Sequence, residues 1–166
     1  MPLNPRRQRA AVVGYALLEA LIAVIVTSIG FIGAARLQTL GMTFNNSALY
    51  RQKATLLGYQ MTDRMRANQI GLLAGAYNNP AAGSAACLDA AAGCTPAALA
   101  TADVTVWRAD LAAQLPSGTG VVCVDSTPDD GTFAAPACDG LGRVLAVKVW
   151  WTDTLGASQF VTVARP

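Results

Sequence analysis

The stretch GYALLEALIAVIVTSIGFIGAARLQ, from Gly14 to Gln38, determines how the rest of the chain is organised. It contains one acidic side chain, Glu19, and the sixteen residues between Glu19 and Arg36 are uncharged. A helix needs about 20 apolar residues to cross the hydrocarbon core of a bilayer. Sixteen residues are slightly short of that length, but Tyr15 to Leu18 extend the apolar run at its N-terminal side. The sequence therefore predicts a membrane-spanning helix.

Three arginines, Arg6, Arg7 and Arg9, precede this helix. A basic head before an apolar run has the order of a signal sequence. Positive charge also favours keeping that end of the chain in the cytoplasm. Without residues 1–14, nine basic residues face ten acidic ones, so the formal charge falls from +2 to −1. The basic residues therefore act locally, as part of either a cleavable secretory signal or a plain single-pass anchor.

The composition excludes several classes of function. Hydrophobic residues make up 53% of the 166 residues, and charged residues only 13%, against about 25% in an ordinary soluble domain. The absence of histidine removes Ser-His-Asp and Cys-His nucleophiles and the usual zinc enzymes. A net charge of +2 is too small for a nucleic-acid binder. We expect no enzyme activity, no cofactor and no metal.

Glu19 is the only glutamate in the chain and lies inside the apolar run. An acidic side chain near the middle of a membrane costs about 2–3 kcal/mol, and its partner must be sought. If the chain were cut after Gly14, a new amino group would stand on Tyr15, four residues away on the same helix face. The terminal ammonium of a neighbouring subunit could then neutralise Glu19. The alternative is that Glu19 lies near the interface and reaches the headgroups without a partner.

The residues quoted above resemble the class III signal of type IV pilins. That signal is a short basic leader that ends in Gly, followed by an aromatic residue and by an acidic residue at the fifth mature position. The match implies cleavage after Gly14 by prepilin peptidase, methylation of Tyr15 and an assembly role for Glu19. Tyr15 is a mild departure, because the family most often has Phe at this position, and Ala16 stands where Thr is common.

A second stretch, NNSALYRQKATLLGYQMTDRMRANQ from Asn45 to Gln69, resembles the helix of the minor pilins called type IV pilus modification proteins, the PilV type. This resemblance implies a minor pilin that helps to initiate and assemble pili. Its partners would be major and other minor pilins and a tip adhesin, in a tip-proximal complex. A type II secretion pseudopilin would share only the first resemblance. The other alternative is a membrane-tethered periplasmic module that binds a ligand or adheres.

The domain organisation follows from the apolar pattern. No proline occurs between Pro5 and Pro80, so one helix can run from Tyr15 to about Ala67. We expect a leader at residues 1–14, a membrane or filament-core helix half at 15–36, an amphipathic half at 37–70 and a periplasmic head at 71–166. In the amphipathic half one apolar stripe should pack on the head; it comprises Tyr50, Ala54, Leu57, Met61 and Met65. Gly30, Gly33 and Gly41 weaken the helix locally or permit close helix contact.

The head is predicted to be α+β, a pilin-like layout in which the long helix packs on a small antiparallel sheet. Asn68 and Gly71 are expected to stop the first helix, and residues 71–95 to form a loop. Thr95-Pro96 predicts the start of a helix that runs to Leu115. Three strands are expected, at residues 121–125, 143–152 and 159–164, and a turn at 153–156 should join the last two. In the second strand, Lys148, Trp150 and Thr152 alternate with Val147, Val149 and Trp151.

Four cysteines lie beyond the predicted membrane segment: Cys87, Cys94, Cys123 and Cys138. Their spacing does not match the short hooks of zinc sites. A periplasmic location permits disulfides, and of the three possible connectivities we favour Cys87–Cys94 and Cys123–Cys138, because each closes a local loop.

Two further groups of residues are of types that occur in ligand-binding sites. Four aspartates could suggest calcium, but DSTPDDG lacks the EF-hand spacing and its terminal Glu, so a polar turn is expected. These are Asp125, Asp129, Asp130 and Asp139. For the tryptophans Trp107, Trp150 and Trp151, packing is expected before adhesion.

Overall fold

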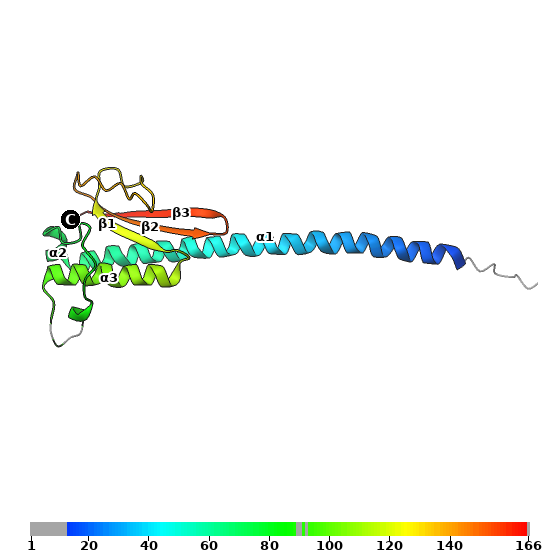
Figure 1. Ribbon diagram of the computed structural model, residues 1–166, viewed down its shortest axis with the longest axis horizontal. Helices are drawn as coiled ribbons and strands as arrows, with labels where there is room; N and C mark the ends of the chain where they lie inside the picture. The colour runs from blue at the N-terminus through cyan, green and yellow to red at the C-terminus, as the bar shows by residue number, and fades with distance from the viewer. Residues whose placement is uncertain (1–12, 89–90, 92, 166) are drawn as a thin grey trace, which may run out of the picture. The chain divides into compact units, whose positions relative to one another are not determined.

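The computed structural model describes the chain except residues 1–12, 89–90, 92 and 166. The leader predicted at residues 1–14 therefore lies largely outside the described residues. The chain divides into two compact units, residues 1–42 and residues 43–166. Helix α1 (Val13–Ala67) contributes to both units. The element order in the second unit is helical first and then three strands, as Figure 1 shows.

Helix α1 ends where the sequence indicates. The apolar stripe of its second half is buried: Ala54, Met61 and Met65 have no exposed surface and Leu57 is 2% exposed, while Tyr50 is half-buried. These residues form the main core of the second unit together with a second helix and one face of the sheet. The predicted core stripe is therefore confirmed.

The segment after α1 contains more regular structure than the sequence indicated. A short helix, α2 (Gln69–Leu73), follows at once, and a single 3-10 turn, η1 (Ala86–Leu88), lies further along. Gly71 does not stop a helix but lies buried within α2, where a Cβ atom would stand 2.5 Å from Nδ2 of Asn68. Asn68 caps α2, since its side chain accepts a hydrogen bond from the Gly71 amide. The prediction of one continuous loop over 71–95 was wrong at these two places.

Helix α3 (Pro96–Gln114) begins as predicted. The hydroxyl of Thr95 accepts a hydrogen bond from the Ala98 amide, and Pro96 occupies the first helical position, where no amide donor is needed. Trp107 packs α3 against α1, because its buried indole N–H donates to the carbonyl of Leu57 at 2.9 Å. Trp107 is thus a core residue.

A buried polar cluster joins the end of α1 to α3. The hydroxyl of Tyr77 donates to Oδ2 of Asp103 at 2.7 Å, and Nδ2 of Asn68 donates to the Tyr77 oxygen at 3.1 Å. Burial, and then the hydrogen bond to Asp103, raise the pKa of Tyr77 well above its ordinary value of 10.0. Tyr77 is therefore a neutral structural donor that anchors the segment after α2.

The sheet has three antiparallel strands in the order β1 (Thr119–Val124), β2 (Leu145–Asp153) and β3 (Gly156–Ala164). The predicted hairpin is confirmed: Asp153 pairs with Gly156 across a two-residue turn. Gly156 has φ +123°, a conformation that glycine adopts without strain. The long helix and this sheet give the α+β layout that the sequence predicted.

Both faces of the central strand β2 are buried, which the sequence did not indicate. Val147, Val149 and Trp151 face the helical core. On the opposite face, Trp150 packs with Val121 and Cys123, and Cys138 of the loop that follows β1 packs against them. Lys148 is entirely buried on that face. The two alternating sets of residues that the sequence showed are thus both buried as far as Trp151, because this loop covers the second face.

Candidate functional site

The residues that the sequence singled out for processing and assembly lie in the first turns of α1. Gly14 and Tyr15 are the second and third residues of the helix, and Glu19 follows one turn after Tyr15. Tyr15, Glu19 and Ile22 line one shallow hollow of the helix surface together with Leu18, Ala23 and Val26. The carboxylate therefore lies among apolar side chains on the same face as Tyr15.

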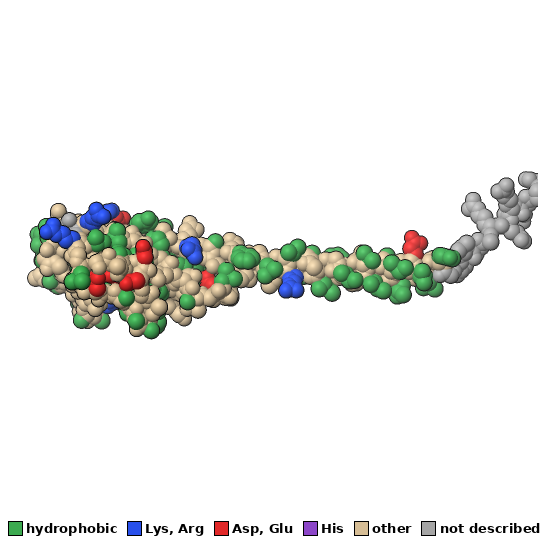
Figure 2. All heavy atoms as spheres, turned by 90° about the horizontal axis from the view of Figure 1, so that it is seen from above, with side chains coloured by type: hydrophobic (Ala, Val, Ile, Leu, Met, Phe, Trp, Pro, Cys, Tyr) green, Lys and Arg blue, Asp and Glu red, His purple; other side chains and the backbone are tan. Residues whose placement is uncertain are grey.

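Every side chain from Tyr15 to Met42 is exposed in the described part of the chain. The side chains are mostly large and apolar: Tyr15 is 76% exposed and Phe31 is 77% exposed. Glu19 and Arg36 are the only charged residues in this range. Figure 2 shows hydrophobic side chains over this part of the helix. By length and composition, this helix is long and apolar enough to cross a membrane.

The polar side chains of the same segment bond to the helix itself. The hydroxyl of Thr27 donates to the carbonyl of Ala23 at 2.7 Å, and that of Ser28 donates to the carbonyl of Val24 at 2.6 Å. A satisfied hydroxyl costs much less to transfer into an apolar medium than an unpaired one. Thr27 and Ser28 therefore do not oppose transfer of the segment into an apolar medium. The carboxylate of Glu19 does oppose it.

The glycines of this segment have no packing role among the described residues. A Cβ atom added at Gly30, Gly33 or Gly41 would meet no heavy atom within 4 Å. Space at these positions is open, so nothing described in the chain explains why the helix carries three poor helix formers there. Close contact with another helix would use them.

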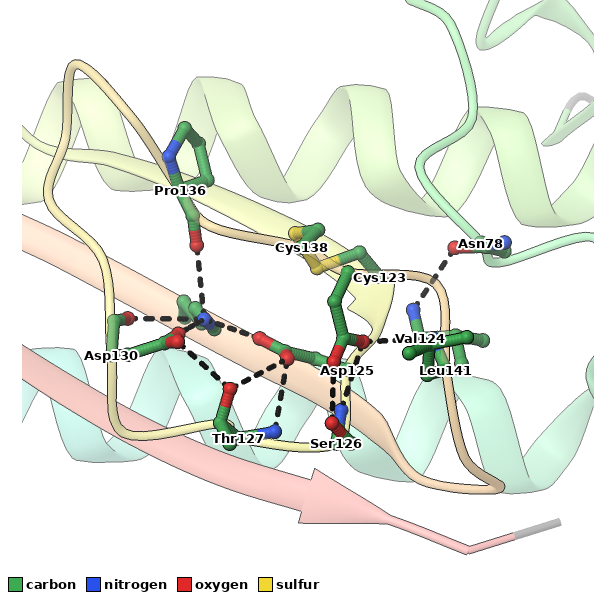
Figure 3. The surroundings of a disulfide bond; sticks show 12 residues. Asn78, Cys123, Val124, Asp125, Ser126, Thr127, Asp130, Pro136, Cys138 and Leu141 are labelled. Atoms are coloured by element: carbon green, nitrogen blue, oxygen red, sulfur yellow. Dashed lines mark hydrogen bonds and ion pairs between the residues drawn. A yellow bond between two sulfur atoms is a disulfide. The ribbon is translucent and has the colours of Figure 1, made fainter.

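The four cysteines form two disulfides, Cys87–Cys94 and Cys123–Cys138. This is the pairing that the sequence favoured. The second bond closes the loop that runs from β1 over the outer face of the sheet, and Figure 3 shows its surroundings. A disulfide that closes a local loop of this size stabilises a fold by about 3 kcal/mol.

Lys148 lies under this loop and binds it through its ammonium group. The Nζ atom lies 2.5 Å from Oδ2 of Asp125 and 2.9 Å from Oδ1 of Asp130. It also donates to the backbone carbonyls of Asp130 at 3.0 Å and Pro136 at 2.9 Å. Figure 3 shows Asp125, Asp130 and Pro136 converging on one point from different parts of the loop. We call Lys148, Asp125, Asp130 and Pro136 the lysine clamp.

The electrostatics of the lysine clamp favour its charged form. Burial alone would lower the pKa of Lys148, but hydrogen bonds and charge from Asp125 and Asp130 outweigh burial and raise it above 10.5. The hydrogen bond from Lys148, and then that from Thr127, lower the pKa of Asp130 below 3.8. The ammonium of Lys148 and the carboxylate of Asp130 therefore stay ionised through the physiological range.

The aspartates that suggested calcium have other partners. The expected polar turn is present, since the Thr127 amide donates to Asp125 and the Asp130 amide to the Thr127 carbonyl. Asp125 is also fully buried and belongs to the lysine clamp. Asp139 accepts hydrogen bonds from the amides of Ser126 and Leu141, and the Ser126 hydroxyl also donates to it. The bonds to Ser126 join the end of the loop to its start.

One metal-like grouping exists among the described residues. Ligand atoms of Cys123, Asp125 and Cys138 lie within 4.8 Å of one another. Both sulfur atoms are used in a disulfide and therefore offer no thiolate, and the carboxylate already holds an ammonium. This grouping does not fit a metal ion.

The sequence missed the lysine clamp, although one signal pointed to it. Lys148 is the only charged residue within the apolar run LAVKVWW. A lysine flanked by large apolar residues on both sides of a strand is seldom fully buried unless it is paired. Its partners, Asp125 and Asp130, lie far from Lys148 along the chain, so the sequence around Lys148 did not reveal them.

Comparisons of the chain with protein-family models, with curated proteins and with solved structures find no match.

Replacing Lys148 by Met should lower the free energy of unfolding by about 3–5 kcal/mol, because it leaves Asp125 buried without its cation. Denaturant unfolding of the full chain in detergent micelles measures this. Arg66→Met is the matched control, since it breaks an exposed pair with Asp63 that contributes about 0–1 kcal/mol. Equal losses in the two variants would contradict the clamp.

Asp130→Asn should make the free energy of unfolding depend less on pH in the acid range. The folded pKa of Asp130 is lowered, so its stabilising effect is present above its ordinary value of 3.8 and is lost as the pH falls through the folded pKa. The effect of Lys148, whose pKa is raised, is complete below 10.5 and is lost only at higher pH. Unfolding free energies measured from pH 2 to pH 7 (roughly the acid limb) test this. Asp129→Asn, at an exposed neighbouring carboxylate, is the matched control variant.

Proposed function

We propose that the chain is a minor pilin: a structural subunit that is cleaved after Gly14 by prepilin peptidase and takes part in initiating and assembling type IV pili. The support comes from the resemblance of residues 14–38 and 45–69 to such proteins, and from an α1 whose exposed apolar part finds no cover within the described chain. In this proposal the subunit acts near the pilus tip, with other minor pilins and an adhesin.

Before assembly, the apolar part of α1 spans the inner membrane. The arginines ahead of it stay in the cytoplasm, and the unit formed by residues 43–166 faces the periplasm. Two disulfides in that unit fit an oxidising compartment. The precursor is thus a single-pass protein with its processing site at the cytoplasmic end of the helix.

Cleavage creates the partner that Glu19 lacks. The new amino group on Tyr15 is positively charged at neutral pH. When subunits pack side by side through their apolar faces, the ammonium of one can lie beside Glu19 of the next. Water is excluded there, so the attraction is stronger than at a surface. Glu19 then selects the axial register of each incoming subunit, while the apolar side chains supply most of the binding free energy.

One observation carries this proposal: a single carboxylate, exposed on an otherwise apolar helix face, one turn after the residue at which cleavage would place an ammonium. A membrane anchor gains nothing from such a residue, since it only raises the cost of insertion.

N-terminal sequencing and intact mass of the protein, produced with and without prepilin peptidase, test the proposal. With the peptidase we expect a mature start at Tyr15 carrying one added methyl group, and without it the full leader. Gly14→Val should block the cleavage in the presence of the enzyme. A mature start at any other residue would defeat the proposal.

Glu19→Ala should leave insertion into the membrane intact and reduce the amount of the protein in sheared pili at least tenfold, since the charge pair that sets the register is lost. Immunoblots of membrane and pilus fractions measure both quantities. Asp63→Ala removes an exposed carboxylate further along the same helix and serves as the control. Normal incorporation of the Glu19 variant would refute charge pairing while leaving cleavage untouched.

A further inference from the structure

A hollow of about 770 Å³ lies on the outer side of the sheet, beside the loop that the lysine clamp holds. Its walls come from the start of β1, the end of β2, the start of β3 and residues 131–134 of the loop. Sites for small ligands commonly have volumes of about 300–1,000 Å³. All residues that line the hollow belong to the second unit.

The lining of this hollow is neutral. None of the described residues around it carries a charge. Several carry hydroxyl groups, which both donate and accept hydrogen bonds; these are Ser117, Thr119, Thr132, Thr152 and Ser158. An anion or cation would lose its hydration here without gaining a counter-charge. The ligand that fits is therefore uncharged.

Three described residues of the lining hold buried hydrogen-bond donors without an acceptor: Nε1 of Trp150, Nε1 of Trp151 and Nε2 of Gln159. Trp151 belongs to the core-facing side of β2, whereas Trp150 and Gln159 face each other across β2 and β3. Trp150 is only 7% exposed. A buried donor that stays unpaired costs about 1–3 kcal/mol, and such groups in folded proteins call for a partner. A purely apolar ligand would leave these donors unpaired, so the ligand must supply acceptor oxygens.

An aromatic ring completes the site. Phe133 lies in the loop at the edge of the hollow and is 65% exposed. An exposed phenyl ring offers a flat apolar surface, which matches the C–H face of a sugar ring. The loop that carries Phe133 is preformed: the Cys123–Cys138 bond and the lysine clamp hold it, and a Cβ at Gly131 would stand 2.5 Å from the carbonyl of Pro136. Preorganisation of this kind lowers the entropic cost of binding.

We propose that this hollow binds a neutral saccharide. The acceptor oxygens of the sugar would pair with the donors of Trp150 and Gln159, its hydroxyls with the serines and threonines, and its apolar face would pack on Phe133. Neutrality, a high density of hydroxyls and an aromatic wall together favour a sugar over a charged, a purely apolar or a peptidic ligand. This binding function does not depend on cleavage or filament assembly.

The test titrates the full chain with N-acetylglucosamine, its β-1,4-linked disaccharide and maltose, in a detergent without a sugar headgroup. Tryptophan fluorescence reports on Trp150 and Trp151, which both line the hollow, and saturation-transfer NMR identifies the sugar protons in contact. We expect saturable binding of at least one of these sugars. Glucose 6-phosphate should bind at least tenfold more weakly than the neutral sugar that binds best, because its charge finds no partner.

Variants separate the site from non-specific binding. Gln159→Leu and Trp150→Phe each remove one donor and keep an apolar side chain of similar shape, so each should weaken binding about tenfold, the value of one hydrogen bond. Phe133→Ala should do the same without disturbing the core, since that ring is exposed. Leu155→Ala, in the exposed turn of the same hairpin, is the control. Absence of saturable binding to all three neutral sugars, preference for the phosphorylated sugar or for a neutral tripeptide, or equal affinities in all variants would each overturn the proposal.

Discussion

The two halves of helix α1 require different surroundings, and the organisation of the rest of the molecule follows from that constraint. From Ala54 to Met65, α1 buries a narrow stripe against α3 and the sheet. From Tyr15 to Met42 it is apolar on all sides and nothing in the described chain covers it. A helix that is hydrophobic all round is stable only when other molecules, lipid or protein, surround it. The second unit is therefore built on half of an element whose other half requires an external partner.

The sheet poses a related problem, because three strands alone cannot bury both faces of β2. The helices cover one face, and the loop after β1 covers the other. The large apolar side chains of this loop, Phe133 and Leu141, are exposed, so covalent and ionic links hold the loop in place. The Cys123–Cys138 bond limits its course, and the ammonium of Lys148 binds its carboxylates and carbonyls from below. The cost of desolvating a lysine is offset only because every acceptor around it is close.

Local signals in the sequence were sufficient for α1, α3 and the hairpin of β2 and β3, but not for α2 and η1. The stripe of α1, the Thr95-Pro96 cap of α3 and the turn before Gly156 each depend on a few neighbouring residues, and each was predicted. The burial of Lys148 was not, because alternation along β2 assigns it to an exposed face. Its burial depends on a loop that begins more than twenty residues earlier along the chain. The donors of Trp150 and Gln159 were equally hidden, since pairing across strands decides whether a polar group finds a partner.

Glu19 is a charged residue in an otherwise apolar helix segment, and this exception to the pattern is informative about function. Hydroxyls in the same segment bond back to the helix, so they cost little in an apolar medium. An ionised carboxylate cannot bond to the helix in this way. It only accepts hydrogen bonds, and the backbone carbonyls that the hydroxyls use are acceptors too. It is tolerated either at a wet interface or beside a cation that arrives with another molecule. The first case requires only an anchor and makes the residue dispensable; the second ties a charge on one subunit to the cleaved end of the next. The two cases differ in what removing the carboxylate does: insertion stays intact in both, but in the first case nothing else changes, and in the second case association of the subunits fails.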